Sequence, residues 1–406
     1  MTARSAIELQ LREQAPRVLG VLVRRHGDFD RCEDAVQEAL LKAHLAWREV
    51  PERPFGWLLT VAERRFVDGL RSDAARARRE QSQALLEPLA TAGMDGLDEQ
   101  DDTLSLLFLC CHPDLPPPSQ IALTLRAVGG LTTDEIARTL LVSPATLAQR
   151  IVRAKARLRG VTFGEPPAPE RGPRLAAVLH VLYLLFTEGH TTSSGPGLVR
   201  DDLAVEALRL TRRLRAARPD DGEVQGLMAL MLLIHARRAS RLSSDGTLVP
   251  LPEQDRSRWD ASAVAEGLAL VEDALAHRPL GPYQLQAAIA AVHAETSDAA
   301  ATDWPQILGL YDLLEGFGHN PVVTLNRAVA VGEVHGPQAG LATLEGLDDQ
   351  LRNGDRHRVH AVRGHLLAMA GDEQAAARAY ALAAREATTP AERRHLADRA
   401  AQLSPP

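Results

Sequence analysis

Residues 131–160 read LTTDEIARTLLVSPATLAQRIVRAKARLRG and carry the start signals of two consecutive helices. Thr132 or Thr133 can cap a first helix, and the two acidic residues that follow suit the positive end of a helix. Ser143 followed by Pro144 is typical of the start of a second helix, because serine accepts from free backbone N–H groups and proline tolerates the first helical position. Two helices joined by a short turn predict a helix-turn-helix.

The second of these helices is basic on its outer side. Its apolar residues, which predict the buried side, are Leu147, Ile151 and Leu158. Such a helix can lie in the major groove of DNA, where arginine bonds guanine and glutamine bonds adenine. The polar residues near its start are Thr146, Gln149, Arg150 and Arg153, and the later Lys155, Arg157 and Arg159 suit phosphates or solvent. A solvated charged face is the alternative, but the absence of any acid between Ala145 and Arg159 favours DNA.

This basic helix belongs to a chain that is acidic overall, with a formal net charge of −7. Residues 1–160 hold 22 Lys and Arg against 22 Asp and Glu, so residues 161–406 hold 46 − 22 = 24 basic and 53 − 22 = 31 acidic residues. The net charge therefore describes the second part of the chain. Because salt screens charges beyond about 8 to 10 Å, a local basic face is sufficient for binding nucleic acid.

Length and composition limit the class of protein. A chain of 406 residues is too long for one ordinary core, and 45% hydrophobic residues with 24% charged ones are typical of globular proteins. No apolar run approaches the roughly 20 residues that a bilayer requires, and no signal segment begins the chain, which indicates a cytoplasmic protein without membrane contact. The pair Cys110-Cys111 before His112 allows a metal site, but there is no second ligand pair, which favours buried cysteines.

Helical periodicity dominates, and no run alternates like a strand, so we expect an all-α protein. Composition divides the chain into residues 1–80, an acidic linker 81–103, residues 104–160, a proline-rich linker 161–174, and a long helical extension 175–406. Within the extension, residues 320–347 and 361–386 each show a small-residue helix, a turn and a second helix. Such pairs resemble tetratricopeptide-type hairpins with an irregular period.

A second nucleic-acid signal lies upstream, where aromatic residues mix with arginines in residues 47–80. Unstacked bases can settle on aromatic rings while arginines hold phosphates. The loop from Trp47 to Phe55 is the best place for an exposed base, whereas Trp57 and Phe66 can instead be core. Just before it, residues 30–47 form a helix whose acidic face can meet a basic partner, and whose leucines Leu40, Leu41 and Leu45 are expected to face inward.

These elements, in this order, resemble a bacterial sigma factor of the extracytoplasmic-function group (group IV of the sigma-70 family). CEDAVQEALLKAHLAW (32–47) and PFGWLLTVAERRFVDGLR (54–71) resemble the sigma-2 domain, and residues 115–159 resemble the sigma-4 domain. The helical remainder resembles the tetratricopeptide-like extension of one subgroup. The resemblance implies a sigma-2 helical domain, a sigma-4 helix-turn-helix domain and a C-terminal array of helical hairpins.

The resemblance also implies roles for residues, as follows. The clamp helices of the largest subunit of the RNA polymerase core would be bound by Asp34, Gln37, Glu38 and Leu41. The melted −10 element would be bound by Arg48, Phe55, Trp57, Arg64, Arg65 and Arg71. The −35 duplex would be bound by Thr146, Gln149, Arg150, Arg153 and Lys155. The acidic linker 81–103 would thread the polymerase cleft, and no cofactor is implied.

Other features of the sequence bear on enzymatic activity, ligand binding and control. No GxSxG, GxxxxGK[ST], HExxH or GxGxxG pattern occurs, which argues against an enzyme. Gln254-Asp255-Arg256 with Trp259 predicts an inter-helix polar network, with a ligand contact as the alternative. The extension is expected to dock intramolecularly and control activity. A helix-turn-helix regulator with a tetratricopeptide-like sensor, which does not direct polymerase, is the alternative to a sigma factor.

Overall fold

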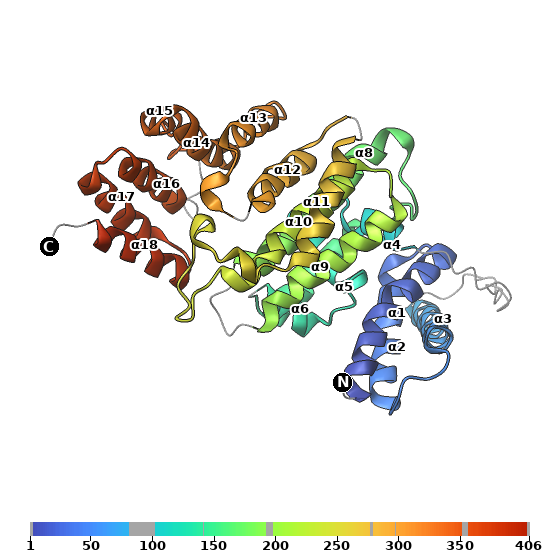
Figure 1. The fold of residues 1–406 in the computed structure, drawn as a ribbon. Helices are drawn as coiled ribbons and strands as arrows, with labels where there is room; N and C mark the ends of the chain where they lie inside the picture. Colours follow the sequence, from blue (N-terminus) through green and yellow to red (C-terminus); the bar gives the residue numbers. More distant parts are fainter. Residues whose placement is uncertain are drawn as a thin grey trace. The chain divides into compact units, whose positions relative to one another are not determined.

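The computed structural model describes residues 3–80, 102–140, 142–191, 198–276, 279–296, 298–350 and 356–403. These residues are helical, apart from turns, loops and one isolated bridge between Leu242 and Leu248, so the all-α prediction is confirmed. The chain forms two compact units, Met1–Leu185 and Phe186–Pro406 (Figure 1). We call them the N-terminal and the C-terminal unit. The finer domain boundaries given by composition stay predictions.

The N-terminal unit begins with three mutually packed helices: α1 (Ala3–His26), α2 (Phe29–Ala46) and α3 (Pro54–Glu80). The turn between α1 and α2 requires Gly27, whose φ is 72°, and Asp28 then caps α2 by accepting from the Arg31 N–H at 3.1 Å. His26 at the end of α1 stacks on Phe66 of α3 with a centroid distance of 4.0 Å. Phe66 is buried, which agrees with the interpretation of this residue as part of the core.

The rest of this unit contains α4 (Thr103–Cys110), α5 (Pro117–Ala127), α6 (Thr133–Thr139), α7 (Pro144–Arg157) and the start of α8 (Ala168–Thr191). Thr132 and Glu135 form a capping box at α6, since Thr132 N donates to Glu135 Oε2 at 2.8 Å and Glu135 N donates to Thr132 Oγ1 at 3.3 Å. Ser143 Oγ accepts from Thr146 N at 3.1 Å at the start of α7. The helix-turn-helix and its caps are confirmed, and Leu147, Ile151 and Leu158 are buried as expected.

The cysteines lie in the core of the N-terminal unit. Cys32, Cys110 and Cys111 are all buried and unbridged. Cys111 Sγ lies 3.5 Å from the Thr124 hydroxyl, and burial raises the pKa of its thiol to about 12. Such thiols pack as small apolar groups, because the reactive thiolate is disfavoured.

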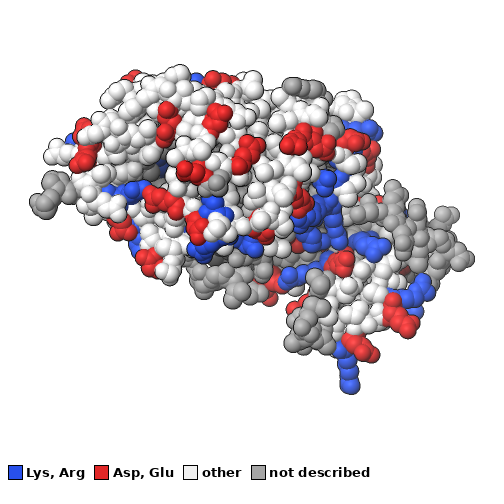
Figure 2. All heavy atoms as spheres, viewed as in Figure 1, with Lys and Arg blue, Asp and Glu red and all other residues white. Residues whose placement is uncertain are grey.

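The C-terminal unit is a succession of helices in which each packs on its neighbours along the chain, such as α10 on α11 and α12, and α16 on α17. After α8, its α-helices are α9 (Leu198–Ala217), α10 (Gly222–Ala236), α11 (Ala261–Ala276), α12 (Pro282–Glu295), α13 (Trp304–Glu315), α14 (Pro321–His335), α15 (Pro337–Thr343), α16 (Arg356–Met369), α17 (Glu373–Glu386) and α18 (Pro390–Gln402). Among the described residues of this unit, four 3₁₀ turns connect them: η1 (Arg238–Ser240), η2 (Leu251–Glu253), η3 (Arg256–Arg258) and η4 (Ala299–Ala301). Figure 2 shows acidic side chains spread over the visible surface rather than gathered in one patch.

Close helix crossings in this unit depend on small residues. A Cβ added to Gly226 of α10 would lie 2.6 Å from the backbone nitrogen of Gln284 at the start of α12. We therefore expect Gly226→Ala to lower the free energy of unfolding by about 1 to 3 kcal/mol, because overpacking displaces backbone. Thermal unfolding of the full chain measures this. Gly309→Ala in α13 is the matched control: nothing lies within 4 Å of its added Cβ, so it should leave the melting temperature unchanged or raise it.

In the part of the chain that the structure describes, no helix is both long enough and apolar enough to span a bilayer.

Candidate nucleic-acid interface

The start of α7 presents an exposed polar face. Thr146, Gln149 and Arg153 are exposed, and Arg150 is half-buried beside them. Within the described residues no ion pair engages Arg150 or Arg153, so both guanidinium groups keep their donors for another molecule. The structure thus brings together, on one side of one helix, four of the five residues predicted for the −35 element.

Lys155 is the fifth residue, and the structure places it elsewhere. Its side chain is only 5% exposed, and its Nζ lies 2.9 Å from Asp30, 2.9 Å from Glu33 and 2.7 Å from Asp34, all on α2. Burial disfavours the charged amine, but the three carboxylates outweigh it and raise the pKa of Lys155. The structure therefore places Lys155 away from the exposed face of α7, where it anchors α7 to α2, and its contact with DNA stays a prediction.

Glu33 is the centre of this ion-pair cluster. It is buried, and it also accepts from Arg126 Nε of α5 at 2.7 Å. Arg159, just after α7, pairs with Asp30 at 3.1 Å. Sequence patterns did not reveal this cluster, because Lys155 and Glu33 are 122 positions apart in the chain. We call Asp30, Glu33, Asp34, Arg126, Lys155 and Arg159 the α2–α7 cluster.

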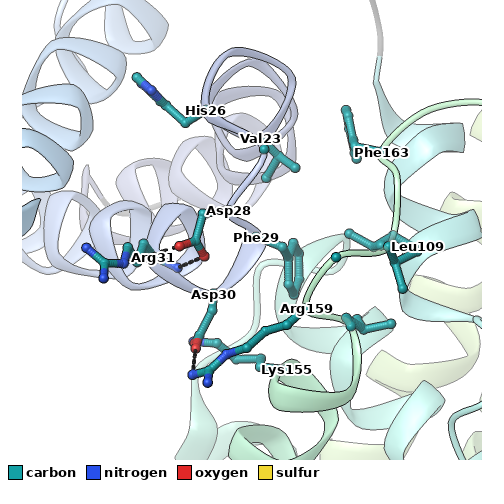
Figure 3. A pocket seen from close by; sticks show the side chains of 14 residues that line it. Val23, His26, Asp28, Phe29, Asp30, Arg31, Leu109, Lys155, Arg159 and Phe163 are labelled. Atoms are coloured by element: carbon teal, nitrogen blue, oxygen red, sulfur yellow. Dashed lines mark hydrogen bonds and ion pairs between the residues drawn. The ribbon is translucent and has the colours of Figure 1, made fainter. Parts of the chain in front are cut away.

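A cavity of about 610 Å³ lies beside the α2–α7 cluster (Figure 3). Its apolar walls are Val23, Phe29, Leu109, Leu158, Val161 and Phe163. The charged groups at its edge have protein partners: Asp30 pairs with Lys155 and Arg159, and Asp28 pairs with Arg31. The cavity lies between the α1–α2 turn and the segment after α7. Because its charged side chains are already paired within the protein, few of them are left to recognise a ligand.

The outer face of α2 forms a stripe of acidic and apolar side chains. Asp34 is 70% exposed despite its contact with Lys155, and Glu38 of the same stripe is exposed. Leu41 and Leu45, expected to face inward, are 60% and 77% exposed, so that expectation was wrong. The buried side of α2 is occupied instead by Phe29, Cys32, Ala35, Val36, Ala39 and Ala43. Because Asp34, Glu38, Leu41 and Leu45 are spaced by three or four residues, they form one continuous helix face, with Gln37 half-buried at its edge.

The residues predicted for single-stranded DNA occupy the α2–α3 loop and α3. Arg48 in the loop and Arg64 and Arg71 on α3 are exposed. Trp57 is half-buried and meets Trp47 edge-on, with ring centroids 5.3 Å apart. Arg65 is partly engaged, because its Nε pairs with Glu38 at 3.0 Å. Arg48 therefore lies beside the tryptophan pair, whose rings are only partly covered, while Arg64 and Arg71 lie further along α3.

Phe55 has a partner that sequence patterns did not indicate. The guanidinium of Arg17, from α1, lies 5.1 Å from the centroid of its half-buried ring. A cation over an aromatic face is attracted by the ring quadrupole. Residues 81–101 of the acidic linker lie outside the described residues. At its end, Asp102 accepts from Arg24 of α1 at 3.1 Å.

Comparison with known families agrees with this arrangement. Residues 11–76 match sigma-70 region 2, residues 105–158 match sigma-70 region 4, and residues 174–275 match a family of unknown function, DUF6596. The chain is 41% identical over 380 residues to the uncharacterized protein R00370 of Rhizobium meliloti (strain 1021), covering 91% of this chain and 89% of that one. It is 28% identical over 153 residues to the ECF RNA polymerase sigma factor SigK of Mycobacterium ulcerans (strain Agy99), covering 36% of this chain and 78% of that one. No solved structure matches.

Sigma-70 regions 2 and 4 define the class: the N-terminal unit is that of a DNA-binding sigma factor of transcription initiation. The chain belongs to the same family as the Rhizobium meliloti protein R00370, with which it shares nearly its whole length.

Proposed function

We propose that the protein is an extracytoplasmic-function sigma factor that directs the RNA polymerase core to specific promoters. The observation that carries this proposal is the presence, in one compact unit, of two separate exposed surfaces of different chemistry. The α7 face offers arginines and a glutamine, which suit the edges of bases. The α2 face offers carboxylates, which repel DNA, and leucines, which suit a protein partner.

The α2 face is proposed to bind the clamp helices of the largest polymerase subunit. Asp34, Gln37, Glu38 and Leu41 supply it, as the resemblance to sigma-2 implies. Two leucines exposed on one acidic helix expose apolar surface that solvent does not favour, and burial of such surface drives association. Arg48, Phe55, Trp57, Arg64, Arg65 and Arg71 are proposed to hold the melted −10 strand, where partly covered rings can accept an unstacked base.

The contact between α7 and α2 is proposed to belong to the free protein. Asp34 is at once a partner of Lys155 and part of the face that polymerase would take. A basic surface of the polymerase that binds Asp34 would therefore compete with Lys155, and binding would weaken the α2–α7 cluster. Separation of α2 from α7 would space the two DNA-binding surfaces for −10 and −35 elements.

The C-terminal unit is proposed to control this activity as a tetratricopeptide-like array. Packing of each helix on its chain neighbours is consistent with such an array. Residues 161–406 carry the whole net charge of −7, which suits basic surfaces of the first unit or of polymerase. Comparing the full chain with a chain ending at residue 185 in transcription tests this role. Equal transcript yields and equal polymerase affinities would remove it.

Run-off transcription tests the main proposal. Promoters are first selected from genomic DNA by mapping fragments bound in the presence of core polymerase. Purified core is then supplied with the wild-type chain or with Leu41→Asp, which places a charge in the proposed docking face. We expect transcripts that start at one site with the wild-type chain, and at least tenfold fewer with Leu41→Asp.

The matched control for this variant is Leu313→Asp, at a leucine of similar exposure on α13. It should transcribe like the wild type. If the chain binds promoters equally with and without core and yields no transcripts, the protein is a helix-turn-helix regulator instead.

A further inference from the structure

A group of arginines lies where α10 ends, outside the proposed DNA and polymerase surfaces. Arg237 is the residue that directly follows α10. The turn η1 packs against η3, and Asp260 N donates to the Ala236 carbonyl at 2.9 Å. Trp259 is therefore held beside the end of α10, although 22 positions separate Arg237 and Trp259 (259 − 237).

Arg256 is satisfied within the protein. Its Nη1 donates to the carbonyls of His293 and Thr296, at the end of α12. Its guanidinium also lies 5.2 Å from the centroid of the Trp259 ring. A helix C-terminus carries partial negative charge, so this arginine has a structural role in joining η3 to α12.

Arg237 and Trp259 are not satisfied in this way. The Nε of Arg237 and the Nε1 of Trp259 are both buried, and neither has a hydrogen-bond partner within the described residues. Trp259 as a whole is only 9% exposed. Since buried N–H groups in proteins are nearly always paired, two such donors beside the same arginine, Arg256, indicate that an acceptor comes from another molecule.

The charged groups that act on Arg237 are positive. The groups that act electrostatically on Arg237 are Arg241 and Arg256, and together with burial they lower its pKa to about 10. His293 faces the same cluster, and burial with the charges of Arg237 and Arg256 lowers its pKa to about 4. Two acids oppose this: Glu392 acts on Arg241, and Asp298 acts on Arg256. Glu392 is already engaged by the Thr389 hydroxyl at 2.8 Å.

We propose that the donors of Arg237 and Trp259, beside the positive charges of Arg241 and Arg256, form a binding site for a small oxyanion, the phosphate or carboxylate group of a metabolite. Guanidinium and indole groups only donate hydrogen bonds, so the ligand must accept them, and three positive charges select an anion. Because the indole donor is buried, the site suits a small molecule rather than a protein segment. This inference does not depend on the proposed function, and it deepens the interpretation of Gln254-Asp255-Arg256 with Trp259 as a ligand contact.

Equilibrium dialysis of the full chain with radiolabelled inorganic phosphate tests the proposal, at constant ionic strength set by chloride. We expect one saturable site per chain. Trp259→Phe removes the indole N–H donor and keeps an aromatic ring, and Arg237→Gln removes the positive charge. Each substitution should weaken phosphate binding at least fivefold. Arg258→Gln, at an exposed arginine of the same turn, is the matched control and should bind like the wild type.

Competition experiments distinguish the two kinds of ligand. Competition by acetate would assign the site to carboxylates, and its failure would assign it to phosphates. Binding that does not saturate, or that is equal in all four proteins, would overturn the proposal. If Arg237→Gln does not fold by circular dichroism, Trp259→Phe alone decides, because this change keeps an aromatic ring in the core.

Discussion

Lys155→Met is expected to lower the free energy of unfolding of the N-terminal unit by about 3 kcal/mol. Removing one partner of a buried ion pair leaves the other charges buried without compensation, which costs about 3 to 5 kcal/mol. The lower figure applies here, because Glu33 keeps Arg126 and Asp30 keeps Arg159. Denaturant unfolding followed by tryptophan fluorescence measures the loss, since Trp47 and Trp57 report on this unit, while Trp259 and Trp304 report on the C-terminal unit, whose unfolding should not change.

Arg153→Met is the control for this experiment. It lies on the same helix and removes a charge of the same sign, but the side chain is exposed, so its effect should stay within about 0.5 kcal/mol. Equal losses in the two variants would mean that Lys155 does not anchor α7 to α2.

The contribution of the α2–α7 cluster also depends on pH in a known direction. The pKa of Asp30 is lowered, because hydrogen bonds and charges from Lys155 and Arg159 outweigh its desolvation. Its stabilising contribution is therefore present above the pKa of about 3.9 in the unfolded chain, and it is lost as the pH falls through the lowered value. The pKa of Lys155 is raised, so its contribution is lost only as the pH rises beyond the alkaline range. The cluster is intact at neutral pH.

Arg153→Ala is expected to weaken binding of the polymerase–protein complex to its promoter by about 1 to 3 kcal/mol, or roughly 5- to 150-fold. A bidentate arginine–guanine contact has this value, and Arg153 is exposed near the start of α7 with its donors available. Fluorescence anisotropy with promoter duplexes that differ at single −35 positions measures it. The loss should be confined to one or two positions, so that the variant binds different sequences more evenly.

Arg157→Ala provides the contrast. Arg157 lies later on α7 and already donates to the Asp114 carbonyl at 3.0 Å. The Arg157→Ala substitution should weaken binding to all duplexes by a similar small factor, as loss of a phosphate contact does. If Arg153→Ala keeps the sequence preference of the wild type, α7 does not read bases through this residue.

Sequence patterns predicted α7 closely, because the signals involved are local. Ser143, Pro144 and the buried Leu147 and Ile151 act within one or two helical turns, and the structure confirms each of them. The same periodicity failed for Leu41 and Leu45, because the buried side of α2 is built largely from alanines that a search for large apolar residues does not weigh. Small side chains let α2 approach α1 and α3, which leaves the leucines outside.

The sequence alone therefore determined the all-helical class, the helix-turn-helix with its caps, and the separation of a basic helix from an acidic C-terminal part. Those features depend on backbone capping, a 3.6-residue period and composition, which act over a few residues. The pairing of Lys155 with three carboxylates of α2, and the position of Arg237 and Trp259 on either side of Arg256, follow only from the three-dimensional fold. Such pairings join residues tens of positions or more apart, and their free energy depends on burial that no local pattern contains.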